Sequence, residues 1–559
     1  MKLNFKNLFK KKPHHEFVEF NDLNIEKTYS TNDIKKEDFN FTQLNESIHD
    51  LKFETKPVSY FKDCFLRFAK NKASIVAACV IGILVLYAII VPAVDPKSNV
   101  PASVNQNGYQ DSYYANVIPK AFENSGFWDG TEIRDVGESV YKVYDAVDQE
   151  QGVERKRIKE VVDKFFQGVT APNGQIISGS TMYRVRYDTY AVGNIQAFRI
   201  SNSDYQRILD YQEEHDVTIL MPLVDYETYV NVEYRQKLEE QGVSSSTIES
   251  RLTSIRQYYV NGKGNYWFKL ERVEGSSGNA FVPVGYDNNA LEDIYLRDSE
   301  GNLVYSTPAD SNNLNVRVNY EHYFEFKYGF EPTFLFGTTN GGRDIWTRLA
   351  EGARFSLLLG IGVSVVNFII GIIWGSIAGY YGGRVDLTME RITDIISAIP
   401  SIVILNIVNT HFPGNNVLGL IVALILPGWI GTASLTRMQF YRFKGQEYVL
   451  ASRTLGARDT RLIFKHIFPN AIGTLVTSSV LMIPSVIFSE SSLTFLGIIN
   501  LGEMVSVGSL LDEGQKSMTT FPHAVLFPAL LISLLMISFN LFGNGLRDAF
   551  NTTLRGADN

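Results

Sequence analysis

Residues 447–469 read Glu447-Tyr-Val-Leu-Ala-Ser-Arg-Thr-Leu-Gly-Ala-Arg-Asp-Thr-Arg-Leu-Ile-Phe-Lys-His-Ile-Phe-Pro469. This stretch predicts two short helices hinged at Gly456, with Asp459 capping the second helix and Pro469 ending it. Hydrophobic runs flank the stretch on both sides, so we expect a loop between two membrane spans. Because the loop is strongly basic, we expect it in the cytoplasm.

The two predicted helices have faces suited to contact with another protein. Tyr448, Ala451 and Leu455 share one face of the first helix, and Ala451 and Ser452 are small enough for another chain to approach the backbone. The second helix has an apolar side and a basic side, formed at i,i+4 spacing by Ile463 with Ile467 and by Arg461 with Lys465. The alternative is a basic amphipathic loop that lies on the inner leaflet.

The loop resembles the EAA loop of ABC-importer permeases, in which a helix–glycine–helix element inserts into a groove on a cytoplasmic ATPase. The spacing from Gly456 to Phe468-Pro469 matches that motif, and Ala451 stands where its first Ala does. Leu450 replaces the motif's Glu and Ser452 its second Ala, a form similar to the peptide-importer branch. The resemblance implies that the ATPase-coupling residues are Glu447, Tyr448, Ala451, Ser452, Arg453, Gly456, Ala457, Arg461, Lys465, Phe468 and Pro469.

A second resemblance lies before the second predicted span. The sequence Phe336-Gly-Thr-Thr-Asn-Gly-Gly-Arg-Asp-Ile-Trp-Thr-Arg348, followed by Gly352-Ala-Arg-Phe-Ser-Leu357, is similar to the GTD-x-x-GRD-x-x-SR…GAR-x-SL signature of dipeptide, oligopeptide and nickel permeases. Thr339 stands where that family usually has Asp. The glycines allow a tight turn, and Arg343 and Asp344 can cap neighbouring chain ends. The signature residues are Gly337, Thr338, Gly342, Arg343, Asp344 and Arg348.

Both ends of the membrane part add to this resemblance. Arg67-Phe-Ala-Lys-Asn-Lys72 is similar to the N-terminal signature of the peptide-permease C subunit. Residues 539–550 are similar to the family's terminal FNLLGDGLRDALDP, with Asn544 in place of Asp.

Composition divides the chain into two chemically different parts. The mean hydropathy of −0.05 is too high for a charged soluble protein and too low for a chain made only of spans. Residues 95–335 carry 23 Lys and Arg against 36 Asp and Glu, a net charge of −13, whereas the rest of the chain is about +5. Neither cysteine, Cys64 or Cys79, lies in the acidic part, so no disulfide framework is expected there. These features predict an acidic soluble domain inserted into a basic membrane protein.

The insertion is predicted to be an α+β domain. Helical patterns cover Val153–Phe166 and Val230–Tyr258, the latter broken near Gly242, and alternating patterns predict strands at Tyr183–Tyr190 and Tyr266–Arg272. The segment has no D-x-D-x-D-G-x5-E calcium loop and no HExxH motif, so its carboxylates are expected on solvated faces.

The membrane part is predicted to be an all-α polytopic bundle, similar to a type I ABC-importer permease, with six spans and both termini in the cytoplasm. The predicted spans are 73–94, Phe355–Tyr380, Ile392–Thr410, Val417–Thr436, Ile472–Leu496 and Val525–Leu546. The corresponding domains are a cytoplasmic tail (1–72), the first span (73–94), the extracellular insertion (95–335), the permease core (336–546, with the docking loop at 437–470) and a cytoplasmic tail (547–559).

Several residues in the spans have expected roles. Asp394 and Asn406 in the third span and Glu490 in the fifth are expected to line the pathway, because lipid cannot satisfy polar groups. Pro400 is expected to kink the third span. Close helix packing is expected at Gly360, Gly371, Gly375 and Gly379.

The sequence has no G-x4-G-K-[ST] phosphate loop, no metal-ligand cluster and no nucleophile elbow. We therefore expect a transporter subunit rather than an enzyme, with no cofactor or metal of its own and with ATP and magnesium on partner subunits. The resemblance implies a C-type subunit of a bacterial peptide importer in the cell membrane. Its implied partners are a B-type permease, two cytoplasmic ABC ATPases, an extracellular peptide-binding (lipo)protein, the peptide and membrane lipids, with no nucleic acid.

Three alternatives stay open. The first is a permease for nickel or another small solute. The second is a membrane-anchored extracellular sensor or enzyme domain, which a catalytic constellation in residues 95–335 would favour. The third is a secondary transporter, which would need no ATPase-docking loop.

Overall fold

The computed structural model describes residues 60–99, 114–122, 127–148, 155–170, 176–193, 195–223, 225, 229–260, 270–272, 281–283, 295–411, 416–502 and 504–550. Most of the tail predicted at 1–72 and most of the tail predicted at 547–559 lie outside the described residues. So does the first part of the strand predicted at Tyr266–Arg272, of which β6 (Leu270–Arg272) is described.

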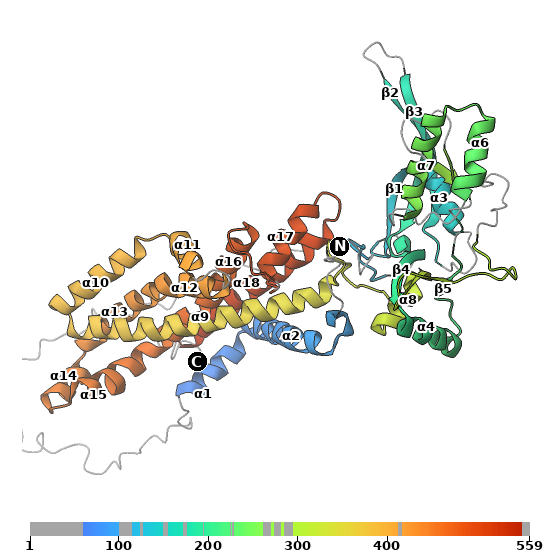
Figure 1. Ribbon diagram of the computed structural model, residues 1–559. Coiled ribbons are helices and arrows are strands. Elements are labelled where there is room, and N and C mark those ends of the chain that lie inside the picture. The colour runs from blue at the N-terminus through green and yellow to red at the C-terminus, as the bar shows by residue number, and fades with distance from the viewer. Residues whose placement is uncertain are drawn as a thin grey trace, which may run out of the picture. The chain divides into compact units, whose positions relative to one another are not determined.

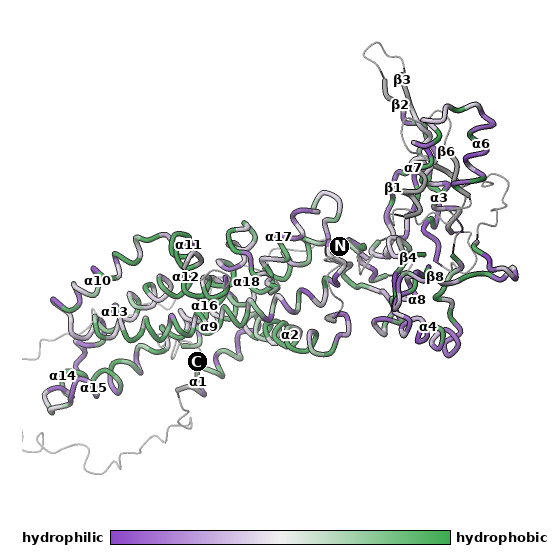
Figure 2. Tube along the Cα trace, viewed as in Figure 1, coloured by the Kyte–Doolittle hydropathy of each residue, from purple (hydrophilic) through white to green (hydrophobic). Residues whose placement is uncertain are grey.

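Within this described part of the chain, five helical stretches are long and apolar enough to cross a membrane, and a bent helix pair raises the number to six. Figure 1 shows these helices, and Figure 2 shows the hydrophobic residues along them. The five are α2 (Lys72–Val94), α9 (Ile345–Tyr381), α12 with α13 (Asn416–Gly428 and Ile430–Lys444), the stretch Asp459–Phe495 that includes α16 (Phe468–Phe495), and α18 (His523–Phe550). The predicted fold class, a mostly helical membrane protein with a strand-containing insertion, is confirmed.

The third predicted span is the bent pair. Helices α10 (Gly383–Ser397) and α11 (Ser401–His411) meet at 74° across a break that contains Pro400. The predicted kink at Pro400 is confirmed, because proline removes a backbone donor and clashes with the preceding turn. The helix before the kink begins earlier than the predicted span, at Gly383 instead of Ile392.

Helix α9 has a stripe of glycines against which other helices pack closely. A Cβ at Gly375 would lie 2.2 Å from the Ala433 carbonyl oxygen, and a Cβ at Gly379 would lie 2.7 Å from the Arg437 carbonyl oxygen. Only glycine allows helix α13 to approach this near, so backbones and small side chains make the contact. The close packing predicted for Gly360, Gly371, Gly375 and Gly379 is confirmed.

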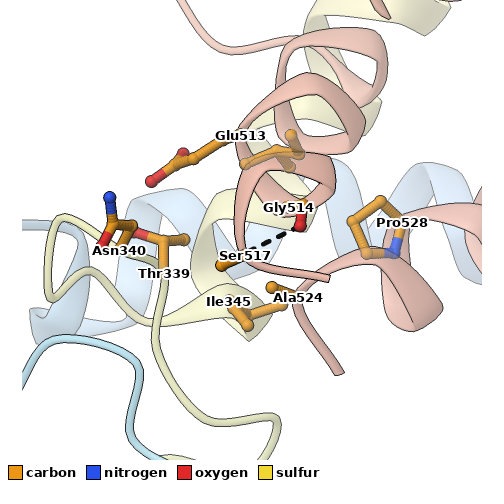
Figure 3. A pocket seen from close by; sticks show the side chains of 9 residues that line it. Thr339, Asn340, Ile345, Glu513, Gly514, Ser517, Ala524 and Pro528 are labelled. Atoms are coloured by element: carbon orange, nitrogen blue, oxygen red, sulfur yellow. Dashed lines mark hydrogen bonds between the residues drawn. The ribbon is translucent and has the colours of Figure 1, made fainter. Parts of the chain in front are cut away.

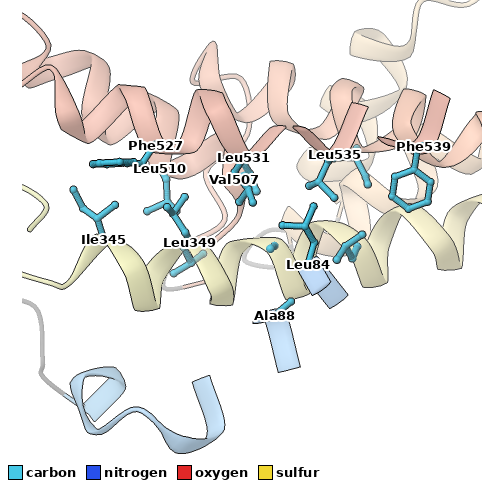
Figure 4. Packing of buried hydrophobic residues seen from close by; sticks show 14 of the residues in the cluster. Leu84, Ala88, Ile345, Leu349, Val507, Leu510, Phe527, Leu531, Leu535 and Phe539 are labelled. Atoms are coloured by element: carbon cyan, nitrogen blue, oxygen red, sulfur yellow. The ribbon is translucent and has the colours of Figure 1, made fainter. Parts of the chain in front are cut away.

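The end of α9 that begins at Ile345 lies in the main apolar cluster of the membrane part. Figure 4 shows this cluster, in which side chains from α2, α9, α18 and the short helix α17 (Val507–Ser517) interdigitate. Its labelled members are Leu84, Ala88, Ile345, Leu349, Val507, Leu510, Phe527, Leu531, Leu535 and Phe539.

The described residues of the insertion form three antiparallel sheets. The first has the strand order β1-β3-β2, and the second has the order β4-β9-β5, with β8 also pairing with β9. The strands are β1 (Thr131–Gly137), β2 (Ile158–Thr170), β3 (Ile176–Asp188), β4 (Ile195–Ser201), β5 (Leu220–Met221), β8 (Ser306–Pro308) and β9 (Asn313–Asn319), and a third sheet pairs β6 with β7 (Phe281–Pro283). Its helices are α3 (Glu138–Asp148), α4 (Asn202–His215), α6 (Arg235–Glu240), α7 (Ser245–Val260) and α8 (Tyr320–Tyr328).

The helix predicted at Val153–Phe166 is wrong, because most of this segment is strand β2. Val161 and Phe165 have the four-residue spacing of a helix face, but both are β-formers, and β2 pairs with β3 over nearly its whole length. The predicted strand Tyr183–Tyr190 is largely confirmed, since β3 ends at Asp188. The helical segment at Val230–Tyr258 is broken at Gly242, as predicted, where φ is +71°.

Substituting Gly375 by Ala is expected to destabilise the membrane part by about 1–3 kcal/mol, because the new methyl group would overlap the Ala433 carbonyl. Gly362→Ala on the same helix is the matched control, since a Cβ there meets nothing within 4 Å. Thermal unfolding of the two purified variants measures the difference. Equal melting temperatures would contradict the packing role of the glycine stripe.

Candidate functional site

The loop at residues 447–469 contains the predicted helix–glycine–helix element. Helix α14 (Glu447–Thr454) ends just before Gly456, whose φ is +83°. The chain then continues through α15 (Asp459–Arg461) and the π-helical turn η7 (Leu462–Ile467). A left-handed φ strongly favours glycine, so the predicted hinge at Gly456 is confirmed.

Two details of the prediction for this loop are wrong. Arg458, not Asp459, is the N-cap of α15, and no side-chain cap hydrogen bond forms. Pro469 does not end the helix: it is the second residue of α16, which follows the π-helical turn η7 without a break. The second helix of the loop therefore runs directly into a membrane-spanning helix.

The loop is fixed to the ends of two spanning helices. Val449, Leu462 and Ile467 are buried against Tyr380 of α9 and Phe440 of α13. Polar contacts reinforce this packing: the Tyr380 hydroxyl donates to Asp459 Oδ1 and accepts from Arg453 Nη2 at 3.3 Å. A movement imposed on the loop would therefore also act on α9.

The other side of the loop exposes large apolar side chains. Leu455 is 88% exposed, Phe464 70%, Leu450 45% and Tyr448 41%. The predicted coupling residues Glu447, Ala451, Arg453, Gly456, Arg461, Lys465 and Pro469 are also exposed, whereas Ser452, Ala457 and Phe468 are half-buried. The predicted residues and the apolar side chains together form what we call the loop surface.

Sequence reasoning placed Leu455 on the face of Tyr448 but did not include it, Leu450 or Phe464 among the site residues. It also missed Tyr380, which lies outside the loop and reaches it only in the folded chain. Phe464 had a usable signal, because it is a large apolar residue between the basic side chains Arg461 and Lys465.

The signature segment before α9 forms a tight turn joined to the start of the insertion. Thr338 is fully buried; its hydroxyl accepts from the Val117 N–H at 2.8 Å and donates to the Tyr114 carbonyl. Gly337 and Gly342 have φ values of +75° and +74°, as the predicted turn requires. A Cβ at Gly337 would also lie 2.2 Å from the Val117 carbonyl oxygen.

The polar members of the signature have separate structural roles. Asp344 caps α9 by accepting from the Thr347 N–H at 3.2 Å and from its hydroxyl at 2.7 Å, in agreement with the predicted capping. Thr339 closes the turn through its backbone and accepts from the Gly341 N–H at 3.2 Å without needing the family's carboxylate. Arg348 forms an ion pair with Glu351 at 2.8 Å, and the buried Nε of Arg343 has no partner among the described residues.

A small pocket lies beside this turn (Figure 3). Thr339 and Asn340 of the turn face Glu513, Gly514 and Ser517 of α17 across it. The remaining lining is apolar and comes from Ile345, Leu510, Ala524 and Pro528.

The buried tyrosine Tyr190 joins the insertion to the same segment. Its hydroxyl lies 3.0 Å from the Phe334 carbonyl and 3.1 Å from the Ile118 carbonyl, and it accepts from the Phe334 N–H at 3.3 Å. Burial raises the pKa of Tyr190, so the phenol stays protonated and can donate. These contacts hold the interior of the insertion against Phe334, which lies just before the signature turn. Tyr190 and Thr338 therefore both connect the insertion to that turn.

The three polar residues expected to line a pathway differ in their surroundings. Asp394 on α10 is exposed and pairs with Arg391 at 3.0 Å, and Asn406 on α11 is also exposed. Glu490 on α16 is 0% exposed, so it does not line an open surface in this structure. Sequence reasoning missed its partner Ser356 because that residue comes from another helix, α9.

Among the described residues, no group of three or more His, Cys, Asp or Glu side chains could hold a metal ion. The bundle of spanning helices with an anchored, exposed helix–glycine–helix loop defines a polytopic helical membrane protein. Residues 371–556 match the family described as binding-protein-dependent transport system inner membrane component, and residues 59–115 match the N-terminal TM domain of oligopeptide transport permease C.

Curated relatives agree with the family models. The chain is 42% identical over 220 residues to the oligopeptide transport system permease protein OppC of Bacillus subtilis (strain 168), covering 39% of this chain and 72% of that protein. It is 39% identical over 221 residues to the dipeptide transport system permease protein DppC of the same strain, covering 39% of this chain and 69% of that protein. It is 34% identical over 237 residues to the glutathione transport system permease protein GsiD of Pectobacterium atrosepticum, covering 42% of this chain and 78% of that protein.

The chain therefore belongs to the family of C-type permease subunits of ABC importers. Among solved structures it is similar to an inward-facing methionine ABC transporter MetNI, with 19% identity and a TM-score of 0.29 over 36% of this chain and 96% of that chain. A score this low carries no argument.

Replacing Tyr380 by Phe is expected to loosen the loop, because Asp459 loses the hydroxyl that bonds it to α9. The expected cost is about 1 kcal/mol, seen as faster hydrogen exchange over residues 459–467. Tyr381→Phe is the control, since among the described residues the exposed Tyr381 hydroxyl has no assigned hydrogen bond. Unchanged exchange in Tyr380→Phe would contradict the anchoring role.

Proposed function

We propose that the chain forms half of the translocation pathway of an ATP-driven peptide importer and couples to cytoplasmic ATPases through residues 447–469. The observation that carries this proposal is the loop surface. Leu455 and Phe464 are exposed on a segment whose opposite side is firmly packed. Exposed apolar side chains beside basic ones are typical of a protein-docking surface.

The mechanism follows from the anchoring of the loop. Closure of the ATPase dimer on ATP would displace α14 and η7, and the contacts of Tyr380 with Asp459 and Arg453 would transmit that displacement to α9. Helix α9 spans 37 residues, about 55 Å at 1.5 Å per residue. A tilt imposed at its Tyr380 end would therefore displace the end that begins at Ile345. The bundle would thereby alternate between inward-open and outward-open states.

The partners and topology are part of this proposal. The chain would pair with a B-type permease, bind two cytoplasmic ATPases that hold ATP and magnesium, and receive peptide from an extracellular binding protein. Both termini and the loop would lie in the cytoplasm of a bacterial cell, and residues 95–335 would lie outside. Support comes from the charge distribution, because basic loops stay on the cytoplasmic side.

The substrate is assigned as peptide because two of the relatives above are named for oligopeptide and dipeptide transport. Nickel or another small solute is the alternative within the family. Uptake of labelled peptide and of ⁶³Ni by the same vesicles separates the two.

Gly456→Ala is expected to reduce ATP hydrolysis coupled to transport while leaving expression and membrane insertion normal. A Cβ there meets nothing within 4 Å, so the penalty of about 1–2 kcal/mol arises only from the left-handed backbone and shifts the two helices of the loop. Gly456→Pro, whose ring fixes φ near −65°, should abolish coupling.

Gly445→Ala is the matched control, because Gly445 lies in the same loop, has open space around it and has a φ of −93°. Peptide uptake and ATPase activity of the reconstituted complex provide the measurement. Full uptake by Gly456→Pro would refute the docking role of the loop.

For the insertion we infer a role in guiding the loaded binding protein onto the permease. The insertion is attached through the hydrogen bonds of Thr338 and Tyr190. Its net charge of −13 favours a basic or mixed partner. A spacer alone would not need two multi-stranded sheets with their own apolar clusters.

Replacing residues 131–319 by a Gly/Ser linker removes β1 to β9 and Tyr190 but keeps the contacts of Thr338 with Tyr114 and Val117. Assembly with the ATPases should persist, while capture of the loaded binding protein should weaken and lose most of its salt dependence. Surface-immobilised complex at low and high salt gives the measurement. Capture and uptake equal to the full chain at both salt concentrations would contradict the guiding role.

A further inference from the structure

Glu490 is a fully buried carboxylate whose assigned partners are hydroxyl groups. Ser356 donates to Glu490 Oε2 at 2.8 Å, and Thr494 donates to Oε1 at 3.2 Å. Ser491 donates to Oε2 at 3.3 Å, and the Ser506 side chain lies close enough to interact with the carboxylate. Hydroxyl donors can satisfy a carboxylate without a counter-ion.

These donors belong to three different helices. Ser356 is on α9, Ser491 and Thr494 are on α16 together with Glu490, and Ser506 is the N-cap of α17. The negative group therefore lies near the positive end of the α17 dipole. The Ser356 hydroxyl also accepts from the Val507 N–H at 3.4 Å, which connects α9 directly to the first residue of α17.

Close packing also contributes to the position of α17. A Cβ at Gly508 would lie 2.6 Å from the Ser491 Cα, and a Cβ at Gly352 would lie 3.0 Å from the Ser506 carbonyl carbon. An apolar residue at position 490 could fill the same space without the cost of burying a carboxylate at membrane depth. The carboxylate thus adds an interaction that is strong only while the three helices keep this geometry.

Helices α17 and α9 connect the Glu490 interaction to two other parts of the molecule. Together with the signature turn, α17 lines the pocket of Figure 3 through Glu513 and Ser517. Helix α9, which supplies Ser356, is the helix that the coupling loop is anchored to through Tyr380. A shift of α9 would separate Ser356 from Glu490 and weaken the hold on α17.

We propose that Glu490 latches α17 to α9 and α16, and that loop-driven movement of α9 breaks this latch and frees α17 during transport. Glu490 is a positioning residue in this scheme, since it acts through α17 and touches no substrate. The inference rests on the proposed function, because the movement that opens the latch is that of the ATPase-coupled loop.

The test measures how accessible α17 is. Leu510, buried on α17, is replaced by Cys in a Cys64→Ser, Cys79→Ser background, and a maleimide labels the purified permease–ATPase complex. Without nucleotide, labelling should be slow in this parent and about tenfold faster with Glu490→Ala, because a charged hydrogen-bond network is lost. Glu490→Gln should also label faster, since the amide NH₂ group is a donor and cannot accept hydrogen bonds from the hydroxyl groups around it.

Ser356→Ala should reproduce the effect, and Ser364→Ala is its matched control. Ser364 is buried on the same helix, but its hydroxyl has no partner among the described residues. The labelling rates of Ser364→Ala should equal those of the parent. Equal rates for both serine variants, or parental rates for Glu490→Gln, would overturn the latch.

A second arm adds a non-hydrolysable ATP analogue. The parent should label faster with the analogue, whereas Glu490→Ala should already be fast and change little. Nucleotide-independent labelling of the parent would make the carboxylate a static support and would refute the latch. Absent peptide uptake would count against the proposed function alone, because labelling without nucleotide is measured independently of uptake.

Discussion

The membrane part depends on the close approach of helices to one face of α9. Glycines along that face meet α17, α16 and α13 in turn, and at Gly375 the contact leaves no room for a methyl group. Lipid is as apolar as leucine, so burial of apolar area gives little drive for helices to associate in a membrane. Close van der Waals contact between backbones supplies the attraction that apolar burial does not. One face of α9 therefore determines where α13, α16 and α17 lie.

Helix α9 also connects the loop at residues 447–469 to the insertion, the two parts of the chain for which functions are proposed. At one end Tyr380 holds Asp459 of the coupling loop, and at the other Asp344 caps the helix directly after the turn that contains Thr338. Both ends are fixed by hydrogen bonds as well as by apolar packing. A helix fixed in this way transmits displacement more directly than one joined by flexible linkers, so the insertion is positioned to respond to the loop.

Features set by local chemistry could be predicted from the sequence, and features set by distant partners could not. The hinge at Gly456, the kink at Pro400 and the packing glycines follow from the backbone properties of those residues. The strand at β2, by contrast, depends on β3, and Pro469 reads as a helix end until the span after it is included. For the same reason Glu490 was predicted to line the pathway, whereas it is buried beside Ser356, which is 134 residues away in the chain.

The loop surface also bears on the choice between a docking element and a helix lying on the membrane. An interfacial helix turns its apolar side toward the hydrocarbon and its basic side toward water. Here Leu462 and Ile467 are already buried against the ends of α9 and α13, whereas Phe464 on the same turn is exposed together with Leu455 across the hinge. Apolar groups on both sides of the element fit a loop held between the spans of its own chain and a second protein. Because Gly456 fixes the angle between α14 and α15, the loop presents a preformed shape, which lowers the entropy cost of docking.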